Sequence, residues 1–435
     1  MAAFRMILTA GAVGIASLWA AGAEAQSAAS PSLGDAIKGG KLLLDVRARY
    51  EFVDQARTGT LTDPADATTV RTRLGWETAE WKGLRGLVEV TNVSHLGPER
   101  FAVNTPGATT PPLNGVDRAR YPLVNDPDVN ELNRLQLTWS PTAVWRLTVG
   151  RQRVLIDDQR FVGNAGWRQD EQTFDAVRAD IALGQVKAVY AYVTHVNRVL
   201  GDLRDWHSDS HLLNVAWVLS NNVRLEGFVY ALDFRNSAAN SSITQGLKVS
   251  GKARAGKAQW TYGATWARQG DYRGNTPSYD LSYWQADAGA AYGVYSVKAD
   301  YEVLEGNGAR GFTTPLATTH AFQGWADAWV QPLGGNKGFV DGLKDFNLTL
   351  EARPKIAAGP FSKPALLLRY HDFDDQRTGV KLAHEWDAQA QAALSARLSV
   401  ALKYADFQRV GGAPLGTAPP PASRTKIWLT LEYKL

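Results

Sequence analysis

The stretch "KLLLDVRARYEFV", Lys41–Val53, alternates apolar and ionic side chains along most of its length. Successive side chains of a β-strand point to opposite faces, so this stretch as a strand has two unlike faces. The apolar face carries Leu42, Leu44, Val46, Ala48, Tyr50 and Phe52. The ionic face carries Asp45, Arg47, Arg49 and Glu51. This pattern is typical of a transmembrane β-barrel, whose apolar face meets lipid and whose polar face lines the lumen.

The same alternation recurs along the whole chain and predicts eighteen strands. The two that follow are "TTVRTRLGWET" and "GLRGLVEVT". A charged side chain that faces the middle of a bilayer costs roughly 2 to 4 kcal/mol, so we expect the arginines of these strands to face the lumen. The remaining strands are predicted at 130–139, 145–153, 173–183, 186–195, 211–219, 223–233, 244–254, 258–268, 280–291, 295–304, 344–353, 365–373, 384–394, 397–407 and 424–435.

Strand parity decides one ambiguous segment. "THAFQGWADAWV", Thr319–Val330, could be a nineteenth strand, but a bacterial single-chain barrel has an even number. We therefore assign Glu305–Leu343 to one long outer loop that contains at most a short helix. The predicted fold is all-β: a single antiparallel up-and-down barrel over residues 41–435, with short periplasmic turns and long extracellular loops. Its first and last strands are expected to pair, because an open strand edge is unfavourable in lipid.

The N-terminal residues have the features of a secretory signal. Arg5 precedes an apolar run that ends in small residues, and Ala23-Glu24-Ala25 fits an A-x-A cleavage site. We predict a signal peptide at 1–25, a periplasmic segment at 26–40 and a location in the cell outer membrane, with membrane lipid as a partner. No later stretch approaches the roughly 20 apolar residues of a membrane helix.

The sequence offers little that suggests catalysis or a cofactor. It has no cysteine, and no nucleophile-elbow or phosphate-loop motif. His207 and His211 are four residues apart, but they lack the glutamate of H-E-x-x-H, so we interpret them as solvated loop histidines. We expect no catalytic residue, metal, cofactor or nucleic-acid partner. An outer-membrane enzyme or adhesin built on a barrel is the lesser alternative.

The candidate solute path is the ionic lumen. Its predicted cations are Arg47, Arg49, Arg71, Arg73, Arg85, Arg134, Arg146, Arg178, Arg369 and Lys403, with Lys248 and Lys298 beside them. They could form a structural ladder with luminal carboxylates of neighbouring strands. They could instead form an electropositive passage, in which arginine binds passing carboxylates. The sequence leaves both interpretations open.

One connection is unusually rich in charged and aromatic residues. It follows the strand that contains Val149, runs from Arg151 to Glu171 and returns through Phe174. Charged side chains there can pair with one another while Phe161, Trp167 and Phe174 supply anchoring surface. If this loop folds into the barrel mouth, it forms a constriction.

The motifs of this connection resemble the alginate export family of outer-membrane barrels. The resemblance rests on "VNELNRLQLTWSP", "VGRQRVLIDDQRFVGNAGWRQDEQTFDAVR" and "HAFQGWADAW" followed by "GLKDFNLTL", in this order along the chain. It extends over nearly the whole mature chain. It implies an eighteen-stranded barrel whose arginine-rich lumen conducts an anionic polysaccharide outward. It also implies mouth or constriction roles for Arg134, Arg151, Arg153, Asp157, Asp158, Arg160, Trp167, Arg168, Phe174 and Asp175.

The function we expect is passive transport or export of anionic saccharides, such as alginate-like polyuronates, or of organic acids through the arginine-rich lumen. Periplasmic export machinery is a further expected partner if a polymer is exported. A general diffusion porin for small solutes is the alternative. These two interpretations, and the barrel enzyme or adhesin named above, differ in the ion selectivity they predict. Only the anion channel requires an excess of positive charge along the path.

Overall fold

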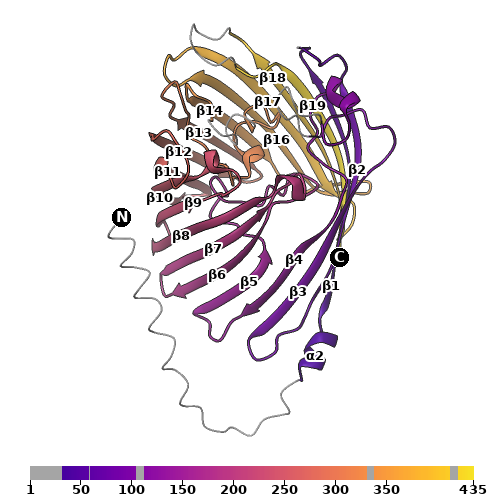
Figure 1. Cartoon of the computed structure of the whole chain (residues 1–435), viewed down its shortest axis with the longest axis vertical. Helices are drawn as coiled ribbons and strands as arrows, with labels where there is room; N and C mark the ends of the chain where they lie inside the picture. Colours follow the sequence, from indigo (N-terminus) through magenta and orange to yellow (C-terminus); the bar gives the residue numbers. More distant parts are fainter. Residues whose placement is uncertain (1–31, 58, 104–111, 331–337, 412–419) are drawn as a thin grey trace.

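The computed structural model describes residues 32–57, 59–103, 112–330, 338–411 and 420–435 (Figure 1). The predicted signal peptide, 1–25, and residues 26–31 of the predicted periplasmic segment, 26–40, lie outside the described residues. The described part of that segment forms the short helix α2, Leu33–Lys38, which Ser32 and Asp35 cap reciprocally. Trp76 Nε1 donates to the carbonyl of Ile37 at 3.0 Å, which holds α2 against the barrel.

The described strands form one closed antiparallel sheet, and the predicted all-β barrel is confirmed. The first strand, β1, pairs with the last, β19, from Asp45 opposite Lys434 to Gln55 opposite Arg424. β15 is a two-residue extension that pairs only with β16, so eighteen of the described strands build the wall. The strands are β1 Lys41–Gln55, β2 Ala65–Glu77, β3 Leu84–His95, β4 Val129–Trp139, β5 Trp145–Gln152, β6 Thr173–Leu183, β7 Val186–Asn197, β8 Trp206–Ser220, β9 Val223–Leu232, β10 Ser242–Ala255, β11 Ala258–Asp271, β12 Asp280–Tyr292, β13 Tyr295–Leu304, β14 Leu343–Ala352, β15 Ala357–Ala358, β16 Phe361–Asp375, β17 Lys381–Ala393, β18 Leu398–Arg409 and β19 Arg424–Lys434.

The wall has the two unlike faces that the sequence predicts. In β1, Arg49 is 2% exposed and Glu51 is 1% exposed, whereas Tyr50 between them is 37% exposed. Leu74 of β2 lies opposite Leu44 of β1 on the same outer face. Because the outer positions are mostly apolar and the inner ones ionic, the barrel has an apolar outer surface and a charged lumen.

Short hairpins join the strands at one end of the barrel. Gly184 links β6 to β7 and Gly293 links β12 to β13, both with positive φ near +60°. Glycine adopts this left-handed conformation without steric cost, which is what a two-residue hairpin requires. No helix of the described chain is both long and apolar enough to cross a bilayer.

Two of the long connections fold into the barrel instead of standing above it. The first, residues 153–172, follows β5, and the second, residues 305–342, follows β13; Figure 1 shows parts of both within the ring of strands. Val162 and Leu316 pair as a parallel bridge, which joins the two loops directly. The predicted long loop at Glu305–Leu343 contains, in its described part, the 3-10 helix η4, Thr319–Ala321, and no wall strand.

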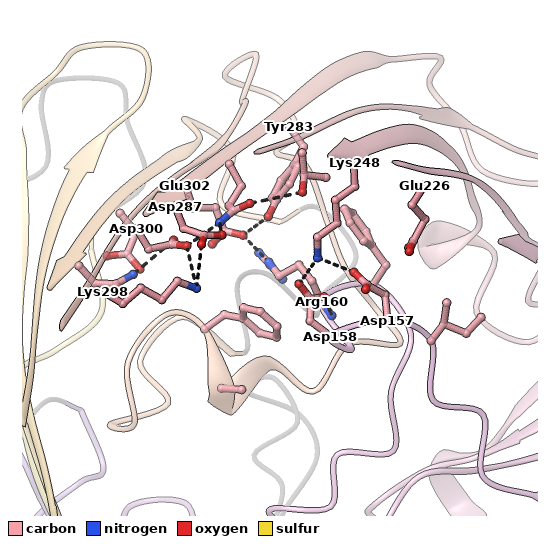
Figure 2. A pocket seen from close by; sticks show the side chains of 18 of the residues that line it. Asp157, Asp158, Arg160, Glu226, Lys248, Tyr283, Asp287, Lys298, Asp300 and Glu302 are labelled. Atoms are coloured by element: carbon pink, nitrogen blue, oxygen red, sulfur yellow. Dashed lines mark hydrogen bonds and ion pairs between the residues drawn. The ribbon is translucent and has the colours of Figure 1, made fainter. Parts of the chain in front are cut away.

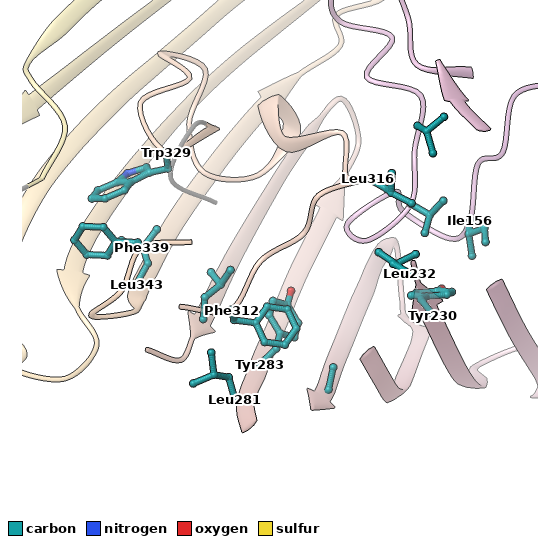
Figure 3. Packing of buried hydrophobic residues seen from close by; sticks show 14 of the residues in the cluster. Ile156, Tyr230, Leu232, Leu281, Tyr283, Phe312, Leu316, Trp329, Phe339 and Leu343 are labelled. Atoms are coloured by element: carbon teal, nitrogen blue, oxygen red, sulfur yellow. The ribbon is translucent and has the colours of Figure 1, made fainter. Parts of the chain in front are cut away.

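The loop residues bury apolar side chains against the inner wall (Figure 3). Trp329 and Phe339 of loop 305–342 lie with ring centroids 5.1 Å apart, and Phe373 of β16 packs on Trp329 at 5.5 Å. Phe312 packs on Tyr283 of β12 in the same way. The two loops therefore have a hydrophobic core of their own inside the lumen, which fixes their position.

The strand β8 corrects one sequence-based interpretation. It begins at Trp206, five residues before the strand predicted at 211–219, so His207 lies within a strand and not in a loop, and His211 lies inside the strand and not at its start. The alternating burial of β8 places both on the outer face, together with the exposed Trp217. Asp209 and the two histidines hid the strand pattern at this end, because they occupy outer positions where apolar residues are expected.

Candidate functional site in the lumen

The two inserted loops meet at an aromatic junction. Trp167 of loop 153–172 stacks on His320 of loop 305–342, with ring centroids 4.0 Å apart and planes 4° from parallel. The ammonium of Lys403, on β18, lies 3.9 Å from the Trp167 ring and 3.6 Å from the Trp325 ring. Arg49 covers Trp167 at 4.1 Å. A cation enclosed by rings is stabilised by their π faces, so this contact ties both loops to β18 and β1.

The hydrogen bonds at this junction fix the charge of His320. Lys403 Nζ lies 3.1 Å from His320 Nε2, and an ammonium can only donate, so Nε2 accepts. The Nδ1–H of the ring then donates to Asp327 at 2.7 Å. Burial, assisted by the charge of Lys403, lowers the pKa of His320 to about 3 against the opposing effect of Asp327. His320 is therefore neutral at physiological pH.

A second cluster joins the loops through ion pairs. Arg168 contacts Asp327 at 2.7 Å and Glu51 at 3.3 Å. Lys426, on β19, contacts the same two carboxylates at 3.0 and 3.2 Å. The four side chains balance their charges, and all of them are buried or nearly so. Removal of one partner would leave a buried charge uncompensated.

The base of loop 153–172 is held by Glu171. Its carboxylate accepts two bonds of 2.8 Å from Arg153 Nε and lies 3.4 Å from Arg73. Burial alone would raise the pKa of Glu171, but Arg73 and Arg153 hold it at about 2. The carboxylate is thus ionised at any physiological pH, and it pairs with one predicted lumen cation, Arg73, and one predicted mouth residue, Arg153.

A cavity of about 780 Å³, the larger of the two described here, opens below loop 153–172 at the end of the barrel where the short turns lie. We call it the periplasmic cavity. Six cations and three carboxylates line it: Arg85, Arg134, Arg146, Arg153, Arg178, Lys187, Glu77, Glu80 and Asp180. Arg178 pairs with Asp180 at 2.6 Å. Among the described residues, no carboxylate lies within 4.0 Å of the charged groups of Arg146 or Lys187. These two exposed cations give the cavity a surplus of positive charge.

A smaller cavity of about 130 Å³ lies against the opposite wall (Figure 2). Its lining has four cations and seven carboxylates: Arg160, Lys248, Lys298, Arg369, Asp157, Asp158, Glu226, Asp287, Asp300, Glu302 and Asp345. Lys248 lies 2.5 Å from Asp157 and 2.7 Å from Asp158. The two cavities of the lumen therefore carry surplus charge of opposite sign.

All ten predicted lumen cations lie on the inner side of the wall, in three settings. Loop 153–172 covers the buried side chains of Arg47, Arg49, Arg71 and Arg73, and the first two of these donate to the carbonyl of Trp167. The periplasmic cavity collects Arg85, Arg134, Arg146 and Arg178. Arg369 lines the smaller cavity and Lys403 fills the aromatic junction. Most of these cations have a carboxylate partner: Arg47, Arg71, Arg73, Arg85, Arg134 and Arg178.

One predicted mouth residue, Arg134, lines the periplasmic cavity instead, and the others divide into two groups. Arg153, Asp157, Asp158, Arg160, Trp167 and Arg168 belong to the inserted loop, and Phe174 is fully buried beside it. Arg151 and Asp175 instead lie opposite each other on β5 and β6, on the outer face that also carries Val149 and Val177. They form a two-bond ion pair of 2.8 and 3.1 Å there. They do not reach the lumen, a placement that the sequence analysis did not expect.

Several site residues were missed from the sequence. Lys187 sits beside a short turn, where the apolar–polar alternation of β7 has only begun. His320, Trp325 and Asp327 lie in a segment without strand periodicity. The only available signal was the clustering of aromatic and charged residues in "HAFQGWADAW". The described residues include no group of three or more acidic or histidine side chains placed to hold a metal ion.

Comparison with known proteins agrees with this architecture. The structure of OpdO from Pseudomonas aeruginosa is similar over 92% of this chain and 98% of its own, with 14% identity and a TM-score of 0.66. OccAB2 from Acinetobacter baumannii is similar over 92% and 99%, with 13% identity and a TM-score of 0.68. OpdK from P. aeruginosa, solved with vanillate, covers 92% and 99%, with 14% identity and a TM-score of 0.63.

No curated protein sequence matches the chain. The sequence profile described as alginate export matches residues 41–299, which is more than half of the chain and spans β1 to β13. That span includes loop 153–172, all the cations of the larger cavity and the outer-face pair. The chain therefore belongs to the alginate export family, and it is an outer-membrane β-barrel channel.

Proposed function

We propose that the channel passes small anionic solutes, namely organic acids and short uronates, through the periplasmic cavity and past the inserted loops. The observation that carries the proposal is the surplus of positive charge at Arg146 and Lys187. Two unit charges 4 Å apart interact by about 4 kcal/mol at an effective dielectric of 20, so an unpaired cation attracts a passing carboxylate strongly.

The inserted loops favour a small solute over a polymer. Trp167, His320 and Lys403 fix both loops to the wall in the middle of the lumen, where a polysaccharide chain would have to pass. A general diffusion pore is the second candidate, and it is favoured by the carboxylate partners of Arg85, Arg134 and Arg178. The carboxylate vanillate in the similar OpdK structure supports the first candidate.

Reversal potentials in planar bilayers under a KCl gradient test the proposal. The wild-type channel is expected to prefer anions, and Arg146→Gln and Lys187→Gln are expected to weaken that preference additively. Arg235→Gln is the matched control, because it removes an exposed cation beyond the extracellular end of β9. A wild-type channel without charge preference would support the general pore, and a cation-selective one would refute the proposal.

A further inference from the structure

The wall of the smaller cavity presents its side chains in two ordered rows. Asp287 of β12, Asp300 of β13 and Asn347 of β14 lie directly opposite one another in register. Lys298 of β13 and Arg369 of β16 form the second row, on either side of Thr349. Adjacent strands are about 4.8 Å apart, so the backbones of Lys298 and Arg369 are separated by about 10 Å.

The row of Asp287 and Asp300 has more negative charge than the single ammonium of Lys298 neutralises. Lys298 Nζ lies 3.7 Å from Asp287 and 3.6 Å from Asp300, so one ammonium serves two carboxylates at distances too long for hydrogen bonds. Its side chain is 49% exposed, which leaves it free to move toward a solute. This row therefore has the capacity to accept a second ammonium.

In the other row, the positive charge of Arg369 is not neutralised by a carboxylate of the described residues. Arg369 Nε donates to Thr349 at 2.8 Å, and among the described residues no carboxylate lies within 4.0 Å of its guanidinium. Arg160, which lines the same cavity and is 3% exposed, has a buried Nη2 without a hydrogen-bond partner. Figure 2 shows Arg160 between the Lys298 group and the Lys248 group. Arg160 pairs with Glu302, so the guanidinium of Arg369 is the group with the capacity to accept a carboxylate.

We propose that this cavity is a binding site for aminocarboxylate solutes, whose carboxylate contacts Arg369 and Lys298 and whose ammonium contacts Asp287 and Asp300. The inference rests on the proposed function and narrows its substrate class. A simple anion is attracted by Arg369 but repelled by the two aspartates, whereas a zwitterion satisfies both rows. A cavity of about 130 Å³ is of the size that holds a small organic molecule.

The test compares 6-aminohexanoate with hexanoate, two probes of equal chain length that differ by one amine. Both fluxes are measured at pH 7 into liposomes that contain the full-length channel. The wild-type flux is expected to be higher for 6-aminohexanoate, and Asp287→Asn with Asp300→Asn is expected to reduce the flux ratio about tenfold. Arg369→Gln is expected to reduce both fluxes.

Lys298→Gln provides a variant with the opposite expected sign. It frees both aspartates, so it should raise the ratio of 6-aminohexanoate to hexanoate, which a misfolded barrel would not do. Asp372→Asn is the matched control, because Asp372 lies on the outer face of β16 and pairs with Lys381. A flux ratio that none of the luminal variants changes, in a channel that remains anion-selective, would overturn this inference and leave the proposed function standing. A cation-selective wild-type channel would refute both.

Discussion

Trp167 and His320 stack face to face at 4.0 Å, and this contact joins the two loops that fill the middle of the barrel. Each ring comes from a different loop, and the ammonium of Lys403 reaches both from the wall. The position of one inserted loop therefore depends on the position of the other. The contact defines the constriction as a unit of two loops and not as one.

Trp167→Ala is expected to loosen this unit. Replacement of a buried tryptophan by alanine costs roughly 3 to 5 kcal/mol, and here the cost falls on the loops and not on the wall hydrogen bonds. Single-channel recordings should therefore show a larger and noisier conductance, while the barrel remains folded. Trp260→Ala is the control, because Trp260 is 50% exposed on the outer face. An unchanged conductance in Trp167→Ala would show that the stack does not hold the constriction.

Acid is expected to release the same unit through His320. Its pKa is lowered by burial to about 3, below the value near 6.5 of an unfolded histidine. The folded loops therefore keep their full stability above about pH 6.5 and lose about 1.4 kcal/mol for each pH unit below that, down to about pH 3. Conductance recorded from pH 7 to pH 4 should rise with acidification. His320→Gln should abolish the rise between pH 6.5 and pH 4.5, and a rise that persists in this variant would assign it to another group.

Arg134 and Glu89 are expected to act as a structural pair. Arg134 donates to Glu89 through bonds of 2.8 and 2.7 Å, and Glu89 is 4% exposed. Removal of one partner of a buried ion pair costs about 3 to 5 kcal/mol, so Arg134→Gln should lower the urea midpoint of unfolding in lipid vesicles. The exchange Arg134→Glu with Glu89→Arg should recover part of the loss. An Arg134→Gln variant as stable as wild type would instead assign Arg134 to the solute path.

The outer-face pair of Arg151 and Asp175 yields a fourth prediction. Each side chain is partly exposed on the wall near the extracellular ends of β5 and β6, where an unpaired charge costs less than the roughly 2 to 4 kcal/mol of mid-bilayer. Asp175→Asn should therefore destabilise the barrel, whereas Arg151→Leu with Asp175→Leu should be tolerated, because it leaves no charge toward lipid. Urea unfolding in vesicles measures both variants. A double variant that is less stable than Asp175→Asn would contradict the lipid-facing placement.

The residue alternation was sufficient to predict the wall and the side of the wall on which each cation lies. In β1 the period of two places Arg47 and Arg49 inward without knowledge of their neighbours, and strand parity correctly excluded Thr319–Val330 from the wall. Arg151 was misplaced because the charged run from Arg151 to Glu171 was assigned to the loop as a whole, although Arg151 lies in β5 opposite Leu135 of β4.

The pairing of the luminal cations could not be predicted from the sequence. Arg47 lies 3.5 Å from Glu432 and Arg168 lies 2.7 Å from Asp327, partners far apart along the chain. Such partners follow from barrel closure and from the path of the inserted loops, and neither leaves a local pattern. The fold follows from the short-range alternation of apolar and polar residues, whereas the electrostatics of the site depends on contacts between residues far apart in the sequence.

The pairing of β1 with β19 has a consequence for how the protein is assembled. Tyr50 meets Leu429 and Arg49 meets Thr430 across almost the whole length of the chain, so this seam contains the strand pairings of greatest sequence separation among the described residues. Contacts between distant residues form slowly, and both strands keep bare N–H and C=O groups until they meet. Because hydrocarbon does not tolerate such groups, the sealing of this last seam and the insertion of the barrel into the bilayer must proceed as one coupled event.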